Sequence, residues 1–242
     1  MKIDRVILSS NESSEYFDFW PLVSLAWKKI GIQPTLIYTG PKKISDSENV
    51  INFHIPNIDS AFVSQNVRLL APILFKDEIC IISDIDDMPL SKDYFQKNIE
   101  IFPDDKFIIY RPDAVPENMI SIMWNVAIGK TWGEIFNIKN LKDIETTLIN
   151  WYPQNYKIRG ENWYFDQIML KNKIDLFVKR YPNRVVRLSD ETTGFNRLNR
   201  SKLKRRFNSF YIEGSNYSDF HMPRPYRKYK KLINKVFDLT FN

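Results

Sequence analysis

The chain has 242 residues, of which 43% are hydrophobic and 14% aromatic, with only 7 glycines. This composition allows a folded core and excludes a largely disordered chain, a collagen-like repeat and a glycine-rich linker protein. The formal charge is +6, and Lys and Arg outnumber Asp and Glu by eleven to two between Arg197 and Lys231. This basic segment indicates either an anionic partner (phosphate, nucleic acid or a membrane surface) or a solvated basic face.

The N-terminal region carries no targeting signal that we can recognise. Its apolar run is only about four residues long, too short for the core of a signal peptide. No stretch approaches the roughly 20 apolar residues that a transmembrane helix needs. The single cysteine, Cys80, excludes an intramolecular disulfide and a cysteine-type zinc site. We therefore expect a cytoplasmic protein, and its basic C-terminal segment would also suit peripheral binding to an anionic membrane.

Segments typical of strands and helices alternate in the first 90 residues. Strands are predicted at 5–10, 34–40 and 50–56 and from Ile79 onward, and helices at 15–30 and 58–74. This order predicts an α/β fold of the Rossmann-like type, with a mostly parallel central sheet flanked by helices.

The second half of the chain is less regular. Strands are predicted at 106–112 and 184–189, a strand leads into a helix near Thr131, another helix covers 161–172, and an amphipathic helix ends the chain. We find no linker that would divide the chain. We therefore predict a single domain over 1–242, with a ligand-binding half at 1–90 and a second half at 91–242.

One stretch, "ICIISDIDDMPL", joins a buried strand to crowded charge. Its apolar part, Ile79 to Ile82, is typical of a core strand, yet Asp84, Asp86 and Asp87 follow directly. Carboxylates this close repel one another and are costly beside a core. On a strand, Asp84 and Asp86 would face the same side with Cα atoms roughly 6.6 Å apart. Such a pair suits a magnesium or manganese ion shared with a phosphate, although a solvated acidic turn is the alternative.

The same stretch carries a resemblance to a known family. "IISDIDDMPL", preceded by "SQNVRLLAPILFKDE", resembles the nucleotide-sugar glycosyltransferases of the GT-A fold, in which a hydrophobic strand ends in a DxD motif. Arg68, Ala71 and Pro72 match the helix that precedes the motif in this family. "WNVAIGKTW", "WYFDQ" and "FHMPRPYRK" are similar to later family segments, in the same order. The resemblance covers nearly the whole chain, and "SSNES" is also similar to small virus-encoded glycosyltransferases.

The resemblance implies a metal site of two carboxylates and one imidazole. Asp86 would bind Mn²⁺ or Mg²⁺ directly, Asp84 would contact the metal or the ribose of the donor, and His221 would be the third ligand. This set is chemically suitable for manganese. It leaves Asp87 without a role.

The resemblance also implies residues that bind the donor. In open α/β sheets, ligands bind outside the carboxyl ends of the strands. Groups from the first strand end, the preceding helix and the basic C-terminus would therefore meet there: Ser9, Ser10 and Asn11 beside the nucleoside, Arg68 on the donor, and Arg224, Arg227 or Lys228 over the diphosphate.

For the acceptor side, the resemblance implies a base and a set of contact residues. Asp166 would deprotonate the acceptor hydroxyl in an inverting enzyme, whereas a retaining enzyme would use Gln167 or a backbone group near the reacting carbon. The acceptor-binding residues would be Trp124, Asn125, Trp163 and Gln167, with Tyr164 also able to stack on a sugar. Aromatic residues in such positions are also common in cores, and "WNVAIG" departs from the family by having no small residue directly after Asn125.

The sequence therefore predicts a metal-dependent glycosyltransferase. It would move a sugar from a nucleotide-sugar donor, with a UDP-sugar favoured, to a glycan hydroxyl, with inversion and Asp166 as base. A phosphotransferase or phosphatase would place its DxD nucleophile on the first strand, not the fourth. A nucleic-acid-binding protein using "RLNRSKLKRRF" and "RPYRKYKK" explains the charge but not the carboxylates, so we expect no nucleic acid partner.

Overall fold

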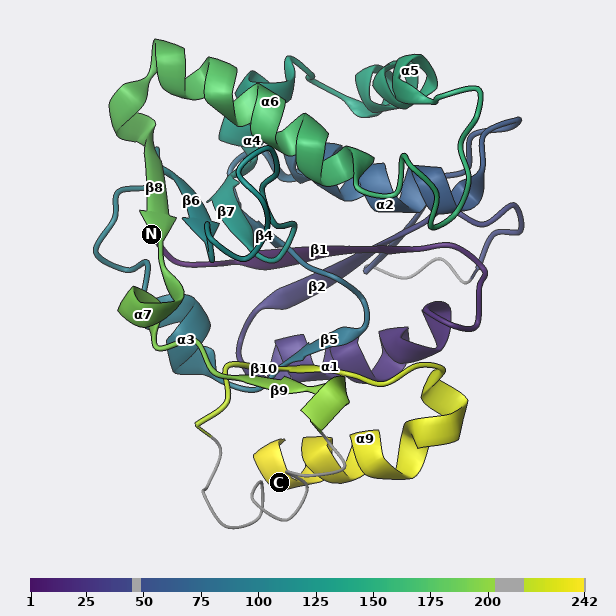
Figure 1. Ribbon diagram of the computed structural model, residues 1–242, viewed down its shortest axis with the longest axis vertical. Helices are drawn as coiled ribbons and strands as arrows, with labels where there is room; N and C mark the ends of the chain where they lie inside the picture. The colour runs from purple at the N-terminus through teal and green to yellow at the C-terminus, as the bar shows by residue number, and fades with distance from the viewer. Residues whose placement is uncertain (45–48, 203–215, 242) are drawn as a thin grey trace.

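The computed structural model describes residues 1–44, 49–202 and 216–241. A seven-stranded sheet forms the centre (Figure 1), in the order β3 (Val50–Asn52), β2 (Gln33–Tyr38), β1 (Arg5–Ser10), β4 (Ile79–Ile82), β7 (Asn125–Ile128), β6 (Phe107–Tyr110) and β8 (Val185–Leu188). Strands β3, β2, β1 and β4 are parallel, as are β6 and β8, whereas β7 is antiparallel to both of its neighbours. The prediction of an α/β fold with a mostly parallel sheet is confirmed.

Helices cover both faces of this sheet. On one side of the sheet lie α2 (Ser60–Leu70), α4 (Gly129–Phe136), α6 (Phe165–Arg180) and, packed on α2, α5 (Leu141–Trp151). On the other side lie α1 (Trp20–Lys29) and, packed on α1, α9 (Tyr226–Phe241), as Figure 1 shows. Within β1, Val6 and Leu8 belong to one hydrophobic cluster and Ile7 to the other. Because successive side chains of a strand point to opposite faces, the apolar run from Val6 to Leu8 in β1 is buried on both sides of the sheet.

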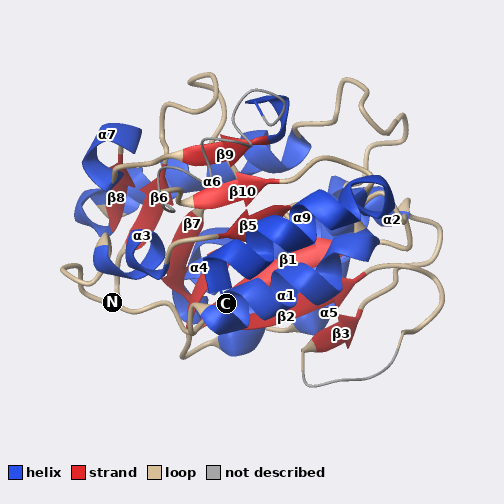
Figure 2. Cartoon of the chain, turned by 90° about the horizontal axis from the view of Figure 1, so that it is seen from below, coloured by secondary structure: helices blue, strands red, loops and turns tan. Residues whose placement is uncertain are grey.

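A second, three-stranded sheet lies on the α1 side and was not predicted. Its order is β5 (Asp87–Pro89), β10 (Asp219–His221) and β9 (Arg197–Asn199), with β10 antiparallel to β5 and parallel to β9. Figure 2 shows it beside α9. Each strand has three residues, too few for a readable alternation of polar and apolar positions. The pairing of β5 with β10 also joins segments more than 100 residues apart.

The predicted helices exist, with shifted ends. The helix expected at 15–30 is a short 3₁₀ turn, η1 (Phe17–Phe19), followed by α1, and the helix expected at 58–74 is α2 followed by the 3₁₀ turn η2 (Ala71–Phe75). The change from α2 to η2 coincides with Pro72, which lacks the N–H that a continuing α-helix needs. Asp59 caps α2 by accepting a hydrogen bond from the amide of Ala61 at 2.8 Å.

The helix α5 was not predicted. The remaining elements are short: α3 (Lys92–Lys97), α7 (Asp190–Thr193), η3 (Pro182–Arg184) and η4 (Arg200–Lys202). None of the helices in the described ranges combines the length and the apolar character needed to cross a bilayer.

Candidate functional site

A cavity of about 420 Å³ opens at the carboxyl ends of β1 and β4. Four segments contribute to its wall: the loop after β1, one face of α2, the turn after β4, and the segment that leads into α6. The lining residues are Ser9, Ser10, Asn11, Ser13, Glu15, Tyr16, Ala61, Ser64, Gln65, Arg68, Asp84, Ile85, Asp86, Ile158, Arg159 and Trp163. The structure thus brings together Ser9, Ser10, Asn11, Arg68, Asp84 and Asp86, as the position of strand ends in an α/β sheet suggested.

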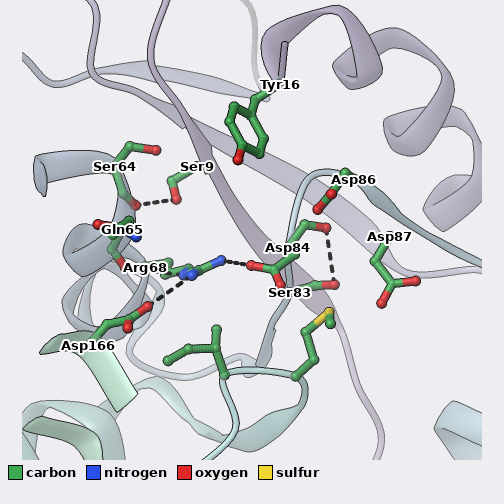
Figure 3. A network of polar contacts seen from close by, with 12 residues as sticks. Ser9, Tyr16, Ser64, Gln65, Arg68, Ser83, Asp84, Asp86, Asp87 and Asp166 are labelled. Atoms are coloured by element: carbon green, nitrogen blue, oxygen red, sulfur yellow. Dashed lines mark hydrogen bonds and ion pairs between the residues drawn. The ribbon is translucent and has the colours of Figure 1, made fainter. Parts of the chain in front are cut away.

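Hydrogen bonds attach the end of β1 to the start of α2. The hydroxyl of Ser9 donates to the carbonyl oxygen of Ser64 at 2.5 Å (Figure 3), and the amide of Asn11 donates to the hydroxyl of Ser60 at 3.2 Å. Ser10 is buried, with 1% of its surface exposed. These bonds fix the polar residues at the end of β1 in the wall of the cavity, so this part of the wall is ordered without a ligand.

Arg68 links two carboxylates from different parts of the chain. Figure 3 shows its guanidinium between Asp84 and Asp166; Nη1 is ion-paired with Asp84, and Nη2 lies 3.0 Å from Oδ2 of Asp166. Burial opposes the charged form of Arg68, but the two carboxylates outweigh it and raise the Arg68 pKa above its usual value. Arg68 therefore lines the cavity with a guanidinium that is already held on two sides.

Asp166 lies behind Arg68 in the first turn of α6. Its side chain is only 4% exposed, and Asp166 is not among the residues that line the cavity. Burial raises the pKa of its carboxyl, while the neighbouring Arg68 opposes that rise. The predicted role of Asp166 as a base remains a prediction, and its direct contact is with Arg68.

Asp84 and Asp86 lie in a turn between β4 and β5, not on a strand. The turn is closed by the amide of Asp87, which donates to the carbonyl oxygen of Asp84 at 3.3 Å. Both aspartates still reach the same cavity. The expectation that the two aspartates lie on a strand is therefore wrong, because the chain turns directly after Ser83. The expectation that they lie close together holds, because both line the cavity.

Asp86 is surrounded by two arginines and a histidine from the C-terminal part of the chain. Its Oδ2 lies 3.1 Å from Nη1 of Arg200, 3.3 Å from Nε of Arg224 and 3.6 Å from Nε2 of His221. Although burial works against ionisation, the hydrogen bond with His221 and the charges of Arg224 and Arg200 lower the Asp86 pKa below its usual value. Part of the compensation that this carboxylate needs is therefore supplied by the protein itself.

The predicted metal ligands are only partly assembled. Asp86 and His221 are neighbours, and a carboxylate with an imidazole is a suitable donor pair for manganese or magnesium. Asp84 lines the same cavity but is engaged by Arg68. Within residues 1–44, 49–202 and 216–241, no three side chains of His, Cys, Asp or Glu are gathered as a metal cluster.

Asp87 points away from the cavity and has a partner of its own. Figure 3 shows its carboxylate directed away from that of Asp86. Oδ2 of Asp87 lies 2.7 Å from Nη2 of Arg197, whose Nε lies 2.5 Å from Oδ2 of Asp219. Burial, only partly offset by Arg197, raises the Asp87 pKa well above its usual value. Asp87 therefore belongs to the small sheet and is separate from the pair at Asp84 and Asp86.

On the acceptor side, the structure contradicts two of the four predicted contacts. Trp124 is 1% exposed and Asn125 is fully buried. The indole N–H of Trp124 donates to the hydroxyl of Ser83 at 3.1 Å, and the Asn125 amide donates to the backbone carbonyl of Ser121 at 2.7 Å. Neither side chain can touch a sugar, because both are enclosed by the core around β7.

The other two acceptor-side residues differ in position. Trp163 lines the cavity and is partly exposed. Gln167 is partly buried in α6, is not part of the cavity wall, and has a buried side-chain oxygen without a hydrogen-bond partner in the described part of the chain. Tyr164 is half exposed and also lies outside the cavity wall. Of the predicted aromatic contacts, only Trp163 is placed to meet a ligand in this cavity.

The C-terminal cations are distributed unevenly around the site. Arg224 reaches Asp86 and hydrogen-bonds to the hydroxyl of Tyr16, with its guanidinium 4.8 Å from the centre of the Tyr16 ring. Lys228 is exposed on α9 and does not line the cavity, and Arg227 pairs with Asp18 at 2.7 Å. The run at 204–206, part of the basic segment considered for nucleic acid, lies outside the described residues.

Sequence reasoning missed several residues around the cavity. Tyr16 and Gln65 line it, as does Arg159, whose Nη2 lies 3.0 Å from Oε1 of Glu15. Gln65 could have been found, because it precedes Arg68 by three residues and so shares its helix face. The others are brought in from loops whose course the sequence pattern does not indicate.

Comparisons with known proteins find similarity only among solved structures. No model of a known protein family matches the chain, and no curated protein matches it. One similar structure is a glycosyltransferase involved in the glycosylation of the major capsid of PBCV-1, with 11% identity, a TM-score of 0.48, and 96% of this chain and 99% of that chain covered. A second is the galactosyltransferase LgtC in complex with donor and acceptor sugar analogs, with 9% identity, a TM-score of 0.46, and coverages of 98% and 95%.

A third similar structure is the glycosyltransferase GlyE of Streptococcus pneumoniae TIGR4. It has 11% identity and a TM-score of 0.48, and the match covers 99% of this chain and 60% of that one. All three of these solved structures are glycosyltransferases.

Proposed function

We propose that the protein is a metal-dependent glycosyltransferase that moves a sugar from a nucleotide-sugar donor, with a UDP-sugar favoured, to a glycan hydroxyl. The observation that carries the proposal is the cavity at the carboxyl ends of β1 and β4. It joins the polar loop after β1 to Arg68 and to the turn with Asp84 and Asp86. Its volume, about 420 Å³, falls in the usual range for small-molecule sites.

The metal ligands in this proposal are Asp86, His221 and Asp84. A bound Mn²⁺ or Mg²⁺ would supply positive charge for the diphosphate that leaves with its bonding electron pair. Arg200 and Arg224, now on Asp86, are close enough to contribute to the same charge stabilisation. Ser9, Ser10 and Asn11 would contact the nucleoside. Neither Arg224 nor Lys228 lines the cavity, but Arg224 is better placed because it contacts Asp86, which does.

The acceptor hydroxyl must lose a proton as the new glycosidic bond forms, and we assign this to Asp166. Its raised pKa makes the carboxylate a better proton acceptor than an exposed aspartate. Trp163 is the proposed surface for a sugar ring, since aromatic faces suit the apolar side of a pyranose. Reaction with inversion follows from this assignment.

Thermal unfolding with and without ligand tests the proposal. We expect UDP, GDP or dTDP with Mn²⁺ to raise the Tm of the protein, because a ligand that binds only the folded state stabilises it. Asp86→Ala should abolish that rise. Asp93→Ala, which removes an exposed carboxylate of α3 paired with Lys97, is the matched control and should keep it. No rise in Tm with any of the three nucleotides would contradict the proposal.

The basic C-terminus does less for nucleic-acid binding than its sequence indicates. Arg197, Arg200 and Arg224 are paired with buried carboxylates, so they do not form an open basic surface along which a nucleic-acid strand could lie. On α9, in contrast, Lys228, Lys230 and Lys231 are exposed. Peripheral binding to an anionic membrane through these lysines remains a prediction, which sedimentation with phosphatidylserine vesicles would test.

A further inference from the structure

The turn that carries Asp84 and Asp86 is held at both of its ends by contacts that sequence reasoning did not predict. At one end, the hydroxyl of Ser83 accepts a hydrogen bond from the indole N–H of Trp124 at 3.1 Å. At the other end, Asp87 is paired with Arg197 at 2.7 Å. Ser83 and Asp87 directly flank the turn, so its two ends are fixed independently of any ligand.

The two side chains that hold these ends also contact each other. The guanidinium carbon of Arg197 lies 5.4 Å from the ring centre of Trp124 and 5.3 Å from that of Phe195. Stacking on aromatic faces suits the planar guanidinium and is stronger where water is excluded. Trp124 and Arg197 therefore act as one unit that joins the large sheet, next to β7, to β9 of the small sheet.

Arg197 also fixes the strand that carries His221. Its Nε lies 2.5 Å from Oδ2 of Asp219, the first residue of β10, and Asp219 is fully buried. The register of the small sheet places His221 opposite Asp87, and the amide of Met222 donates to the carbonyl oxygen of Asp86 at 2.9 Å. One guanidinium thus determines the positions of β5 and β10, and with them the approach of His221 to Asp86.

The charges explain why this arrangement depends on Arg197. Asp87 and Asp219 are both buried and face the same cation, which satisfies them together. Ser218 also donates to Asp219, at 2.7 Å, whereas Oδ1 of Asp87 has no hydrogen-bond partner among the described residues. Without the guanidinium, two buried carboxylates would repel each other across the strand pair that carries the site.

From this geometry we infer that Trp124 and Arg197 are positioning residues for the proposed metal and diphosphate site. They touch neither the cavity nor a ligand, and they act by holding the turn from Asp84 to Asp86 against His221. Asp87 thereby gains a role, because its ion pair with Arg197 fixes one end of the turn. The binding consequences of this positioning role rest on the proposed function, whereas its consequences for the order of the turn do not.

Hydrogen–deuterium exchange of Arg197→Met tests the order of the turn without any ligand. We expect amides at 84–90 and 219–222 to exchange about tenfold faster or more than in the natural protein, with no change in β1 and β4. Arg5→Met is the matched control, because Arg5 is also paired with a carboxylate, Glu78, and stacked on a ring, Phe75, but lies at the opposite end of β1. Unchanged exchange at 84–90 in a folded Arg197→Met protein would overturn the inference.

Two further variants keep the test decisive if Arg197→Met does not fold. Trp124→Phe keeps a ring for stacking but removes the donor to Ser83, so we expect faster exchange at 83–86 and little change at 219–222. Asp87→Asn combined with Arg197→Met removes one of the two repelling carboxylates and should restore part of the order lost in Arg197→Met. Wild-type exchange at 83–86 in Trp124→Phe, or no restoration in the double variant, would count against the inference.

Binding of UDP with Mn²⁺ provides the second readout. We expect Arg197→Met to bind about 10- to 100-fold more weakly, the usual effect of losing a residue that orients metal ligands, while Arg5→Met binds as the natural protein does even if its Tm falls equally. If the natural protein does not bind UDP with Mn²⁺, the donor proposal fails, and the exchange experiment still decides the inference. If the natural protein and Arg197→Met bind UDP with Mn²⁺ equally tightly, the positioning role is overturned and the donor proposal is not.

Discussion

Arg224 lies between Asp86 and Tyr16, with its Nε 3.3 Å from Oδ2 of the aspartate and its guanidinium over the tyrosine ring. A cation that bound Asp86 would compete with Arg224 for the same oxygen. In the proposed function, Arg224 would also stabilise the negative charge of the diphosphate. Metal binding and diphosphate binding would then be linked through the carboxylate of Asp86.

Arg224→Met should shift the balance between these two ligands. We expect Mn²⁺ alone to bind roughly fivefold more tightly, because about 1 kcal/mol of competing ion pairing is lost. UDP with Mn²⁺ should bind more weakly than to the natural protein, because a cation beside the diphosphate is gone. Isothermal titration calorimetry measures both. Arg227→Met, which breaks the exposed pair with Asp18, should change neither, and a parallel loss of both affinities in Arg224→Met would contradict the competition.

The two tryptophans predicted to stack on sugars should behave in opposite ways. Trp124→Ala empties a buried position and should lower the free energy of unfolding by about 3–5 kcal/mol. Trp163→Ala, at the cavity wall, should lower it by less than about 1 kcal/mol and should weaken ligand binding instead. Urea unfolding, followed by ligand titration of the Trp163 variant, separates the two effects. A large loss of stability in Trp163→Ala would show that this ring belongs to the core.

Gly129→Ala should destabilise the protein, although glycine at this position resembles a family motif of the acceptor side. A Cβ at Gly129 would lie 2.2 Å from the carbonyl oxygen of Phe75 and 2.4 Å from that of Pro72, both backbone atoms that cannot turn away. We expect a loss of about 1–3 kcal/mol, typical of overpacking. Gly31→Ala is the contrast, because no atom lies within 4 Å of its added Cβ and only its left-handed φ of +82° opposes the change. Equal stability of Gly129→Ala and the natural protein in urea would refute this interpretation.

Asp166→Asn distinguishes a base from a partner of Arg68. We expect kcat to fall by about 10²–10⁴-fold, the usual contribution of general base catalysis, while UDP with Mn²⁺ still binds. Asparagine keeps an oxygen that can accept from Arg68, so the ion network loses a charge but not its hydrogen bond. If binding and turnover fall by the same factor, Asp166 acts by orienting Arg68 and Asp84, and the base lies elsewhere.

The strands of the large sheet could be predicted because each is marked by a local signal, whereas their order within the sheet was not predicted. β1 has an apolar run from Val6 to Leu8 and ends in Ser9 and Ser10, and the apolar β4 is followed by Asp84, so the edge at which Ser9 and Asp84 meet was predictable. The pairing between short segments that are distant in the sequence could not be predicted. β5 and β10 have three residues each, and nothing in "DMP" or "DFH" specifies that they meet.

The charged residues were also only partly predictable from the sequence. Three aspartates after a core strand clearly required compensation, but the sequence did not identify Arg197, Arg200 and Arg224 as the groups that supply it. The basic segment was interpreted as a surface for an external anion, and part of it instead neutralises the protein's own carboxylates. Burial of Trp124 was likewise unreadable, because the same residue in the same motif could line a pocket or fill a core.

The contacts of Asp86 also set an order of events during synthesis. All seven strands of the large sheet are complete once Leu188 has been made, and so are the cavity walls from β1 and α2. Arg200, His221 and Arg224, the partners of Asp86, are translated afterwards. The strands of the large sheet can therefore be made before the partners of Asp86 are available, whereas the surroundings of Asp86 are complete only after Arg224 has been made.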